Sequence, residues 1–366
     1  MDTSEIILVL VVVTALAFDF TNGFHDTANV VATSISTRAM APRIAVAFAS
    51  ILNFVGAFIS LEVAATVAKD VVDPEAITTT VIFAGLIGAI CWNLITWYFG
   101  LSSSSSHALI GGVVGATLVV AGVDAIFCDG ILGKVLVPAL IAPTVAFFVG
   151  AVAIVITYRI VGRQRPGPVS NGFRGGQVVS GGLLALAHGT NDAQKTMGVI
   201  VLALIASGHL PDDGFEIPFW VVVAAATAIA AGTYMGGWRI IRTMGTRIHK
   251  MDAAQGFTAQ GAGAAVILAS THYGFPLSTT QVISGGVMGS GAGKRLSAVR
   301  WGVAGNIVVA WILTFPLAAA FGAIVYGVTQ IFGDGAVGPL LVALAGVIAV
   351  VVFLTRRIRA GEPLPA

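Results

Sequence analysis

The chain has 366 residues, of which 57% are hydrophobic and only 10% are charged. Soluble domains carry roughly a quarter charged residues, so this composition excludes an ordinary soluble protein and indicates one that lies in a lipid bilayer. The formal net charge of +2 gives no sign of a nucleic-acid partner, because in a membrane protein the distribution of charge matters more than its sum.

Apolar runs of about 20 residues, the length that crosses a hydrocarbon core, follow one another along nearly the whole chain. They predict an all-α polytopic membrane protein with about 11 crossings. The first and sixth segments are expected to be broken helices, with the first break at Gly23. In chain order, the predicted segments cover residues 6–35, 45–63, 77–100, 101–122, 135–158, 178–207, 219–238, 253–270, 275–294, 303–325 and 338–354.

One polar stretch interrupts the apolar pattern, and the chain contains it twice. Residues 101–115 read LSSSSSHALIGGVVG, and residues 275–289 read FPLSTTQVISGGVMG. At an offset of 174, polar residues pair with polar residues and glycines pair with glycines. The polar pairs are Ser104 with Ser278, Ser105 with Thr279, Ser106 with Thr280, and His107 with Gln281.

A second motif precedes each copy of this stretch. NGFHDTAN begins at Asn22 and HGTNDAQK begins at His188, and the two align at an offset of 166 with Asp26 on Asp192. The two offsets differ by only eight residues. Both motifs therefore belong to one duplicated unit.

The duplication divides the chain into four parts. They are membrane repeat 1 (1–161), a cytoplasmic linker (162–176), membrane repeat 2 (177–325), and an additional C-terminal transmembrane helix with a tail (326–366). Loops rich in Lys and Arg stay in the cytoplasm, and here such loops follow alternate crossings. Because the first repeat has an odd number of crossings, the second is expected to have inverted topology, which is a transporter architecture. The N-terminus is then outside and the C-terminus cytoplasmic, in a plasma or inner membrane.

The two Ser/Thr-rich stretches are predicted to form two re-entrant hairpins, because irregular polar backbone at membrane depth must line a cavity or be buried in protein. Free N–H groups, the helix dipole and capping hydroxyls at the start of the following helix favour an anion. Two such helix ends would hold a small oxyanion. The alternative is that the hydroxyls bond only within a membrane helix. The candidate anion ligands are Ser104, Ser105, Ser106, His107, Asn191, Lys195, Ser278, Thr279, Thr280 and Gln281.

Asp26 and Asp192 indicate that cations accompany the anion. A carboxylate at the bilayer centre costs on the order of 2.5 to 3.5 kcal/mol even on the lenient insertion scale, and it would repel a neighbouring anion. Sodium ions, or protons on the acids, would compensate the charge, so the electrostatics predict symport, with Na⁺ as a candidate ion at the two aspartates. The candidate cation-coupling residues are Asp26, Asp192, Asn22, His25 and Asn29.

Several polar residues have an alternative role. The asparagines at 22, 29 and 191 either add amide oxygens to cation sites or satisfy irregular backbone. Lys195 either binds the anion, pairs with Asp192 or extends toward the interface. His188 either hydrogen-bonds an anion, relays protons or lies at the inner membrane boundary.

These residues resemble the PiT inorganic phosphate transporters, whose duplicated signature is a Gly-x-Asn-Asp motif followed by a Ser/Thr-rich stretch. GTND, which ends at Asp192, matches that signature, and GFHD, which ends at Asp26, departs from it at His25. The resemblance spans essentially the whole chain. It implies uptake of inorganic phosphate driven by a cation gradient, with the two aspartates at the paired acidic positions.

The departure at His25 and the short linker look most like the bacterial low-affinity branch of the family. For some members of that branch, proton coupling and carriage of a neutral divalent metal phosphate are described, while sodium drives others. Ser102 stands where the second copy has Pro276, so the proline that usually opens this hairpin in the family is absent from the first half.

The expected function is secondary active import of inorganic phosphate by symport with H⁺ or Na⁺. The phosphate travels either alone or as a neutral complex with Mg²⁺ or another divalent cation. A sulfate permease on the same scaffold is the alternative, and the sequence leaves a homo-oligomer open. A membrane-embedded phosphatase would need a nucleophile with an activating base or metal cage. The chain has no metal-ligand spacing, so we expect neither an enzyme nor a cofactor.

Overall fold

The computed structural model describes residues 3–73, 76–211 and 216–359, and this part of the chain is helical without a named strand. The predicted all-α class is confirmed. The helices are α1 (Thr3–Ser36), α2 (Pro42–Gly56), α3 (Glu62–Lys69), α4 (Thr79–Phe99), α5 (Ser105–Ala121), α6 (Cys128–Gly130), α7 (Val137–Val161), α8 (Pro166–Ala206), α9 (Phe219–Met235), α10 (Trp238–Arg242), α11 (Ala253–His272), α12 (Thr279–Lys294), α13 (Trp301–Gln330) and α14 (Val337–Arg359).

Four helical segments in the described part of the chain are long and apolar enough to cross a membrane: Thr3–Ser36, Thr79–Phe99, Cys128–Val161 and Trp301–Gln330. A bent pair, Phe219–Met235 with Trp238–Arg247, makes a fifth if it is one span. Large apolar side chains cover the outside of α7 and α13, as they do on helices that face lipid. The chain is therefore a multi-pass membrane protein, while the count of about 11 crossings and the re-entrance of the hairpins stay predictions.

The expected helix breaks at the two aspartate motifs are wrong, because α1 and α8 run through them without interruption. A Cβ on Gly23 would lie 2.4 Å from the Ile229 carbonyl oxygen, and one on Gly189 would lie 2.2 Å from that of Asn53. These glycines let neighbouring helices approach closely and leave the helical backbone intact. A bend of 59° lies instead between α9 and α10, at the pair formed by Gly236 and Gly237.

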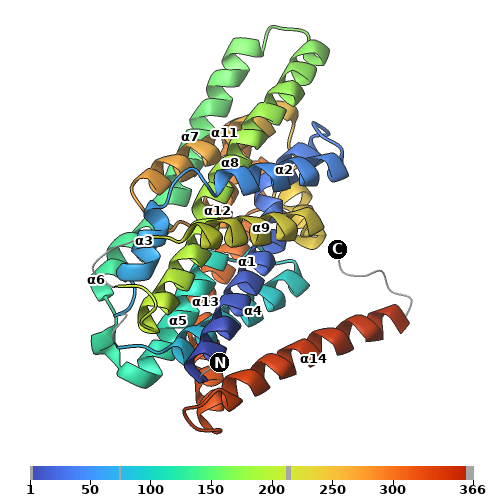
Figure 1. Cartoon of the computed structure of the whole chain (residues 1–366). Helices are drawn as coiled ribbons and strands as arrows, with labels where there is room; N and C mark the ends of the chain where they lie inside the picture. The colour runs from blue at the N-terminus through green and yellow to red at the C-terminus, as the bar shows by residue number, and fades with distance from the viewer. Residues whose placement is uncertain (1–2, 74–75, 212–215, 360–366) are drawn as a thin grey trace.

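Two other predicted segments differ from the structure. The span expected at 45–63 is divided, because α2 ends at Gly56 and α3 begins at Glu62. Most of the predicted linker at 162–176 is helical, because α8 already begins at Pro166, where proline's fixed backbone angle suits a first helical turn. The resulting hairpin of α7 and α8 projects beyond the rest of the body (Figure 1). Its cytoplasmic location stays a prediction.

Helices of each half of the duplication pack against helices of the other half. Helix α5 packs against α13, and its repeat counterpart α12 packs against α7. In the same way α1 packs against α9, and α8 packs against α2. The repeated glycines make these contacts possible, because an added Cβ would meet a backbone oxygen of the neighbouring helix at 2.6 Å or less. The close pairs are Gly111 with Phe315, Gly115 with Ala319, Gly285 with Pro143, and Gly289 with Phe147. Reciprocal packing of this kind is expected of two halves related by approximate two-fold symmetry.

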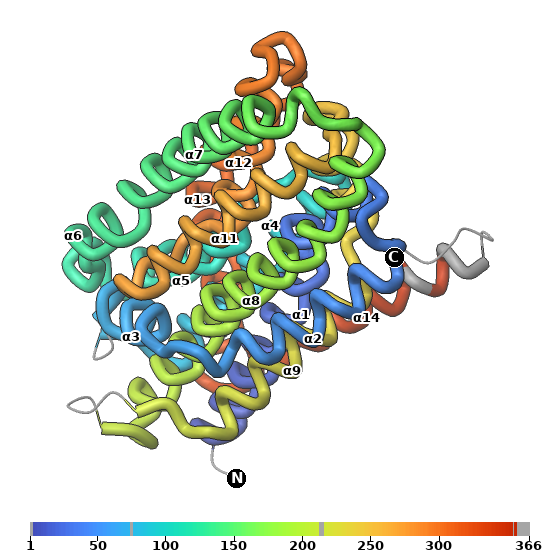
Figure 2. Tube along the Cα trace, turned by 90° about the horizontal axis from the view of Figure 1, so that it is seen from above, coloured from blue at the N-terminus to red at the C-terminus, as the bar shows by residue number. Residues whose placement is uncertain are grey.

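Helix α14 lies apart from the packed body (Figures 1 and 2). It contacts α13, and it touches α1 and α4 at fewer positions. The additional C-terminal helix expected at 338–354 is therefore present as a helix. Its first turns pack against the body, through Val342 and Ala343, and most of its later large apolar side chains are exposed.

We expect the substitution Gly115→Ala to destabilise the protein, because the new Cβ would lie 2.0 Å from the Ala319 carbonyl oxygen. Overpacking of this kind costs about 1 to 3 kcal/mol. The matched control is Gly261→Ala in α11, where a Cβ would meet nothing within 4 Å, so the midpoint should stay level or rise. Thermal unfolding in detergent measures both variants, and equal midpoints would contradict the proposed role of close packing.

Candidate functional site

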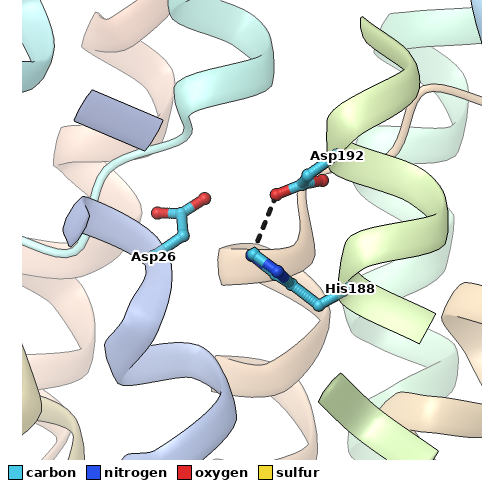
Figure 3. A group of neighbouring side chains, drawn as sticks. All are labelled: Asp26, His188 and Asp192. Carbon is cyan, nitrogen blue, oxygen red and sulfur yellow. Dashed lines mark ion pairs between the residues drawn. The ribbon is translucent and has the colours of Figure 1, made fainter. Parts of the chain in front are cut away.

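The two repeated aspartates approach each other in the interior. Asp26 on α1 faces Asp192 and His188 on α8 (Figure 3). One ligand atom from each of these residues lies within 4.8 Å of the others. All three side chains are buried. The helices that carry the motifs therefore bring them to one place, as the duplication predicts.

Asp26 accepts hydrogen bonds from the first turns of both α5 and α12. The Ser105 hydroxyl donates a hydrogen bond to Asp26 Oδ2 at 2.8 Å, and the Thr280 hydroxyl donates one to Oδ1 at 3.2 Å. His25 Nδ1 lies 2.7 Å from the same Oδ1 atom. A carboxylate from the first half is thus bound to polar turns from both halves.

Asp192 repeats part of this arrangement. The Thr279 hydroxyl donates to Asp192 Oδ2 at 3.1 Å, which matches the bond from Ser105 to Asp26 in the other half. His188 Nε2 lies 3.1 Å from the same Oδ2 atom. The Lys195 ammonium contacts Oδ1. Asp192 therefore has a fixed positive partner, whereas Asp26 has none of this kind.

Lys195 occupies the repeat position of Asn29. The Asn29 amide donates to the Thr280 hydroxyl at 2.8 Å, and the Lys195 ammonium donates to the Ser106 hydroxyl at 2.6 Å. Lys195 also donates to the Leu277 carbonyl oxygen at 2.7 Å. With Asp192 as the third acceptor, all three N–H bonds of the ammonium are used. The structure thus places Lys195 in the ion pair that the sequence left open, and a direct contact with an anion would require one of these bonds to be released.

The first turns of α5 and α12 meet at the site. Ser104 caps α5 by accepting from the His107 amide at 3.1 Å, and Ser278 caps α12 by accepting from the Gln281 amide at 3.3 Å. The amides just ahead of these capped positions have no partner within their own helix, so each helix start can bind an anion. His107 Nδ1 lies 3.4 Å from Gln281 Nε2. These two residues are repeat counterparts, so their contact lies where an approximate two-fold axis relating the two halves would pass.

The remaining predicted residues lie close to the same turns. His25 Nε2 is 3.2 Å from the Thr96 hydroxyl, and the Asn191 amide donates to the Thr271 hydroxyl at 2.9 Å. The amide oxygens of Asn22, Asn29 and Asn191 are buried and have no hydrogen-bond partner among the described residues. Free amide oxygens are suitable ligands for hard cations. The structure therefore brings the predicted site residues together in one buried region, except that Asn22 faces Asp19, and their individual roles stay predictions.

Several polar residues near the site were missed or left unassigned by sequence reasoning. His188 is buried against Asp192, and its Nδ1 lies 3.2 Å from Asn53 Oδ1. Asp19 on α1 is fully buried, and neither carboxylate oxygen has a hydrogen-bond partner among the described residues. Asp19 lies seven residues before Asp26, which is two turns along the same face of a helix. A carboxylate in an apolar run at that spacing was the available signal.

The fold and the site define a class of protein. Buried carboxylates, two helix starts suited to an anion and free amide oxygens meet inside a duplicated, multi-pass helical membrane protein, which is the arrangement of a secondary transporter. Residues 22–322 match the sequence pattern of the phosphate transporter family. The chain belongs to this family, whose members are transporters and not enzymes.

Similar proteins extend over nearly the whole chain. A protein of Mycobacterium tuberculosis is 51% identical over 357 residues, which is 98% of this chain and 86% of that protein. A protein of Bacillus subtilis is 44% identical over 328 residues, which is 89% of this chain and 98% of that protein. Both are named "Probable low-affinity inorganic phosphate transporter". A solved structure titled "The sodium-dependent phosphate transporter" aligns with a TM-score of 0.78 at 25% identity, and covers 89% of this chain and 99% of that one.

Proposed function

We propose that this protein imports inorganic phosphate across the membrane by symport with a cation, Na⁺ or H⁺. Membership of the phosphate transporter family supports the substrate, and the likeness to a sodium-dependent transporter supports a cation. The observation that carries the proposal is the pair of matching hydrogen bonds from Ser105 to Asp26 and from Thr279 to Asp192. They join each carboxylate directly to a helix start that suits an anion.

These bonds give a physical reason for coupling. A hydroxyl has a single hydrogen to donate, so Ser105 can donate it either to Asp26 or to a phosphate oxygen. When phosphate takes that hydrogen bond, Asp26 loses a donor beside a new negative charge. Binding of a cation at the carboxylate then becomes more favourable, and the linkage acts equally in the reverse direction. Phosphate and cation therefore bind together, which is the requirement for symport.

The topology proposed for transport follows from the duplication. Two inverted repeats that meet at the binding site would expose it alternately to each side of the membrane. The N-terminus is placed outside and the C-terminus in the cytoplasm, because of the distribution of Lys and Arg among the loops. The reciprocal packing of α5 with α13 and of α12 with α7 is compatible with two such repeats.

A divalent metal phosphate is a second candidate substrate. Asp26, His188 and Asp192 offer two carboxylates and an imidazole within 4.8 Å of one another, and this ligand set suits several divalent ions. The Lys195 ammonium on Asp192 opposes this candidate, because a divalent ion at that carboxylate would repel or displace it. Free phosphate with monovalent cations is therefore the better supported form.

The decisive experiment measures radiolabelled phosphate uptake by purified protein in proteoliposomes. Sodium, pH and Mg²⁺ are varied separately, and liposomes without protein provide the background. We expect accumulation above the outside concentration that collapses when an ionophore removes the driving gradient. Competition by unlabelled phosphate but not by sulfate would separate the two anions. Absence of accumulation under every gradient would contradict the proposal.

A further inference from the structure

Asp19 is a buried acid that no polar contact explains. Its side chain is 0% exposed, and both carboxylate oxygens have no hydrogen-bond partner among residues 3–73, 76–211 and 216–359. Buried polar groups almost always have a partner, and each exception calls for a ligand, a water or a functional reason. The Asp19 carboxylate therefore marks a position where something else is expected to bind.

Two polar side chains face the Asp19 carboxylate, the hydroxyl of Thr196 on α8 and the amide of Asn22 on α1. The Thr196 hydroxyl and the Asn22 amide oxygen also have no partner in the described part of the chain, and both residues are buried. The two Asp19 carboxylate oxygens and the Thr196 hydroxyl, from two helices, are thus left without a close partner within the described ranges in one place, with the Asn22 amide beside them. Carboxylate, amide and hydroxyl oxygens are the ligands that hard cations prefer.

This position exists in only one half of the protein. At the offset of 166, the counterpart of Asp19 is Ala185 and the counterpart of Thr196 is Val30, and neither of these side chains has a polar atom. The position is therefore separate from the symmetric pair formed by Asp26 and Asp192, although it lies on the same two helices.

The charges around Asp19 determine which charge a ligand at this position should carry. Asp192 is already paired with Lys195, and Asp26 has His25 and two hydroxyl donors. Among the described residues Asp19 makes no ion pair, and the two charges that act on it, Asp192 and Lys195, are already paired with each other. A single carboxylate beside an ammonium attracts one positive charge but not two. The ligand is accordingly a monovalent cation. It must also be small, because the position is completely buried.

We propose that Asp19, Asn22 and Thr196 bind a small monovalent cation, Na⁺ or a proton, as an additional coupling ion. The proposal rests on the cation-coupled phosphate import proposed above, and it assigns one of the coupling ions to a position outside the symmetric pair. Sodium would be held by the carboxylate, amide and hydroxyl oxygens together. A proton would sit on the Asp19 carboxyl and remove its buried negative charge.

The test compares Asp19→Asn and Thr196→Val with the unmodified protein in two measurements. The first is the dependence of phosphate uptake in proteoliposomes on sodium at fixed pH and on pH at fixed sodium. The second, which needs no transport, is the rise of the unfolding midpoint in detergent when NaCl replaces choline chloride. Asp70→Asn is the control for loss of a carboxylate, because Asp70 is partly exposed and pairs with Lys134 away from the site.

With sodium at the site, Asp19→Asn should raise the sodium concentration for half-maximal uptake at least tenfold and remove part of the stabilisation by NaCl. Thr196→Val should give a smaller shift in the same direction. With a proton at the site, the pH dependence of uptake should flatten in Asp19→Asn while its sodium dependence stays unchanged. Either result supports the proposal and identifies the ion.

An Asp19→Asn protein that takes up phosphate with unchanged sodium and pH dependence would overturn the inference and leave the proposed function intact. Failure of the unmodified protein to accumulate phosphate under any gradient would overturn the proposed function instead. If Asp19→Asn does not fold, the milder Thr196→Val variant decides. If phosphate uptake by Thr196→Val then depends on sodium and pH as uptake by the unmodified protein does, the result counts against the site.

Discussion

Asp26→Asn is expected to abolish concentrative phosphate uptake while leaving the protein folded. Asparagine has nearly the same shape as aspartate, and its carbonyl oxygen can still accept from Ser105 or Thr280. The negative charge that attracts the cation is lost, however. A cation about 4 Å from a carboxylate gains about 4 kcal/mol at an effective dielectric constant of about 20, so its loss should weaken cation binding at least about a hundredfold. Uptake of labelled phosphate against a gradient measures this loss.

Two controls separate coupling from folding in this experiment. Asp70→Asn removes a carboxylate from a partly exposed pair with Lys134 and should retain uptake close to that of the unmodified protein. The unfolding midpoint of Asp26→Asn in detergent should stay within a few degrees, because its hydrogen-bond acceptor remains. Concentrative uptake at the unmodified rate in Asp26→Asn would show that Asp26 holds no coupling ion.

The internal repeat was the most reliable guide to the site. It predicted that the Ser/Thr-rich stretches and the aspartate motifs belong together, and the structure joins Ser105 to Asp26 and Thr279 to Asp192. A duplicated pattern constrains two places in the structure at once. For that reason it indicated the binding region more firmly than either motif alone could.

Helix continuity was harder to predict, because glycine has two opposite uses. It loosens a helix by roughly 1 kcal/mol relative to alanine, and it also allows two helices to pack closely. The sequence at Gly23 suggests a break, but the backbone of α9 lies where a Cβ would be. Only knowledge of the neighbouring helix separates these uses. The packing of α5 on α13 and of α12 on α7 could not be predicted for the same reason, because the sequence does not show which helices are neighbours.

Residues that occur in only one half escaped the prediction for a related reason. Comparing two copies finds what they share, so Asp19 opposite Ala185 gave no repeated signal. The sequence shows the charge of Lys195. Whether its ammonium contacts an anion or Asp192 depends on the position of the side chain, which the sequence does not give. The two copies are thus alike at the aspartates and at the hydroxyls that bond them, and they differ in the charged residues placed around this pair.

The second large effect is expected at Lys195. Lys195→Met keeps the side chain out to its ε position and removes the ammonium, so Asp192 loses its fixed positive partner. An uncompensated buried carboxylate of this kind costs about 3 to 5 kcal/mol, and the unfolding midpoint in detergent should fall clearly. Added sodium should restore part of the loss, because a free cation can take the place of the ammonium at Asp192.

Lys195→Asn gives the second half the residue that the first half has at Asn29. Its amide can donate to the Ser106 hydroxyl, as Asn29 does to Thr280, so we expect a smaller loss of stability than in Lys195→Met. The unfolding midpoint of Lys195→Asn should also rise more steeply with NaCl than that of the unmodified protein, with choline chloride as the reference salt. Lys134→Met is the matched control, since its pair with Asp70 is partly exposed and such pairs contribute about 0 to 1 kcal/mol. An unchanged midpoint in Lys195→Met would mean that Asp192 needs no positive partner, and the electrostatic argument for cation coupling at this carboxylate would then fail.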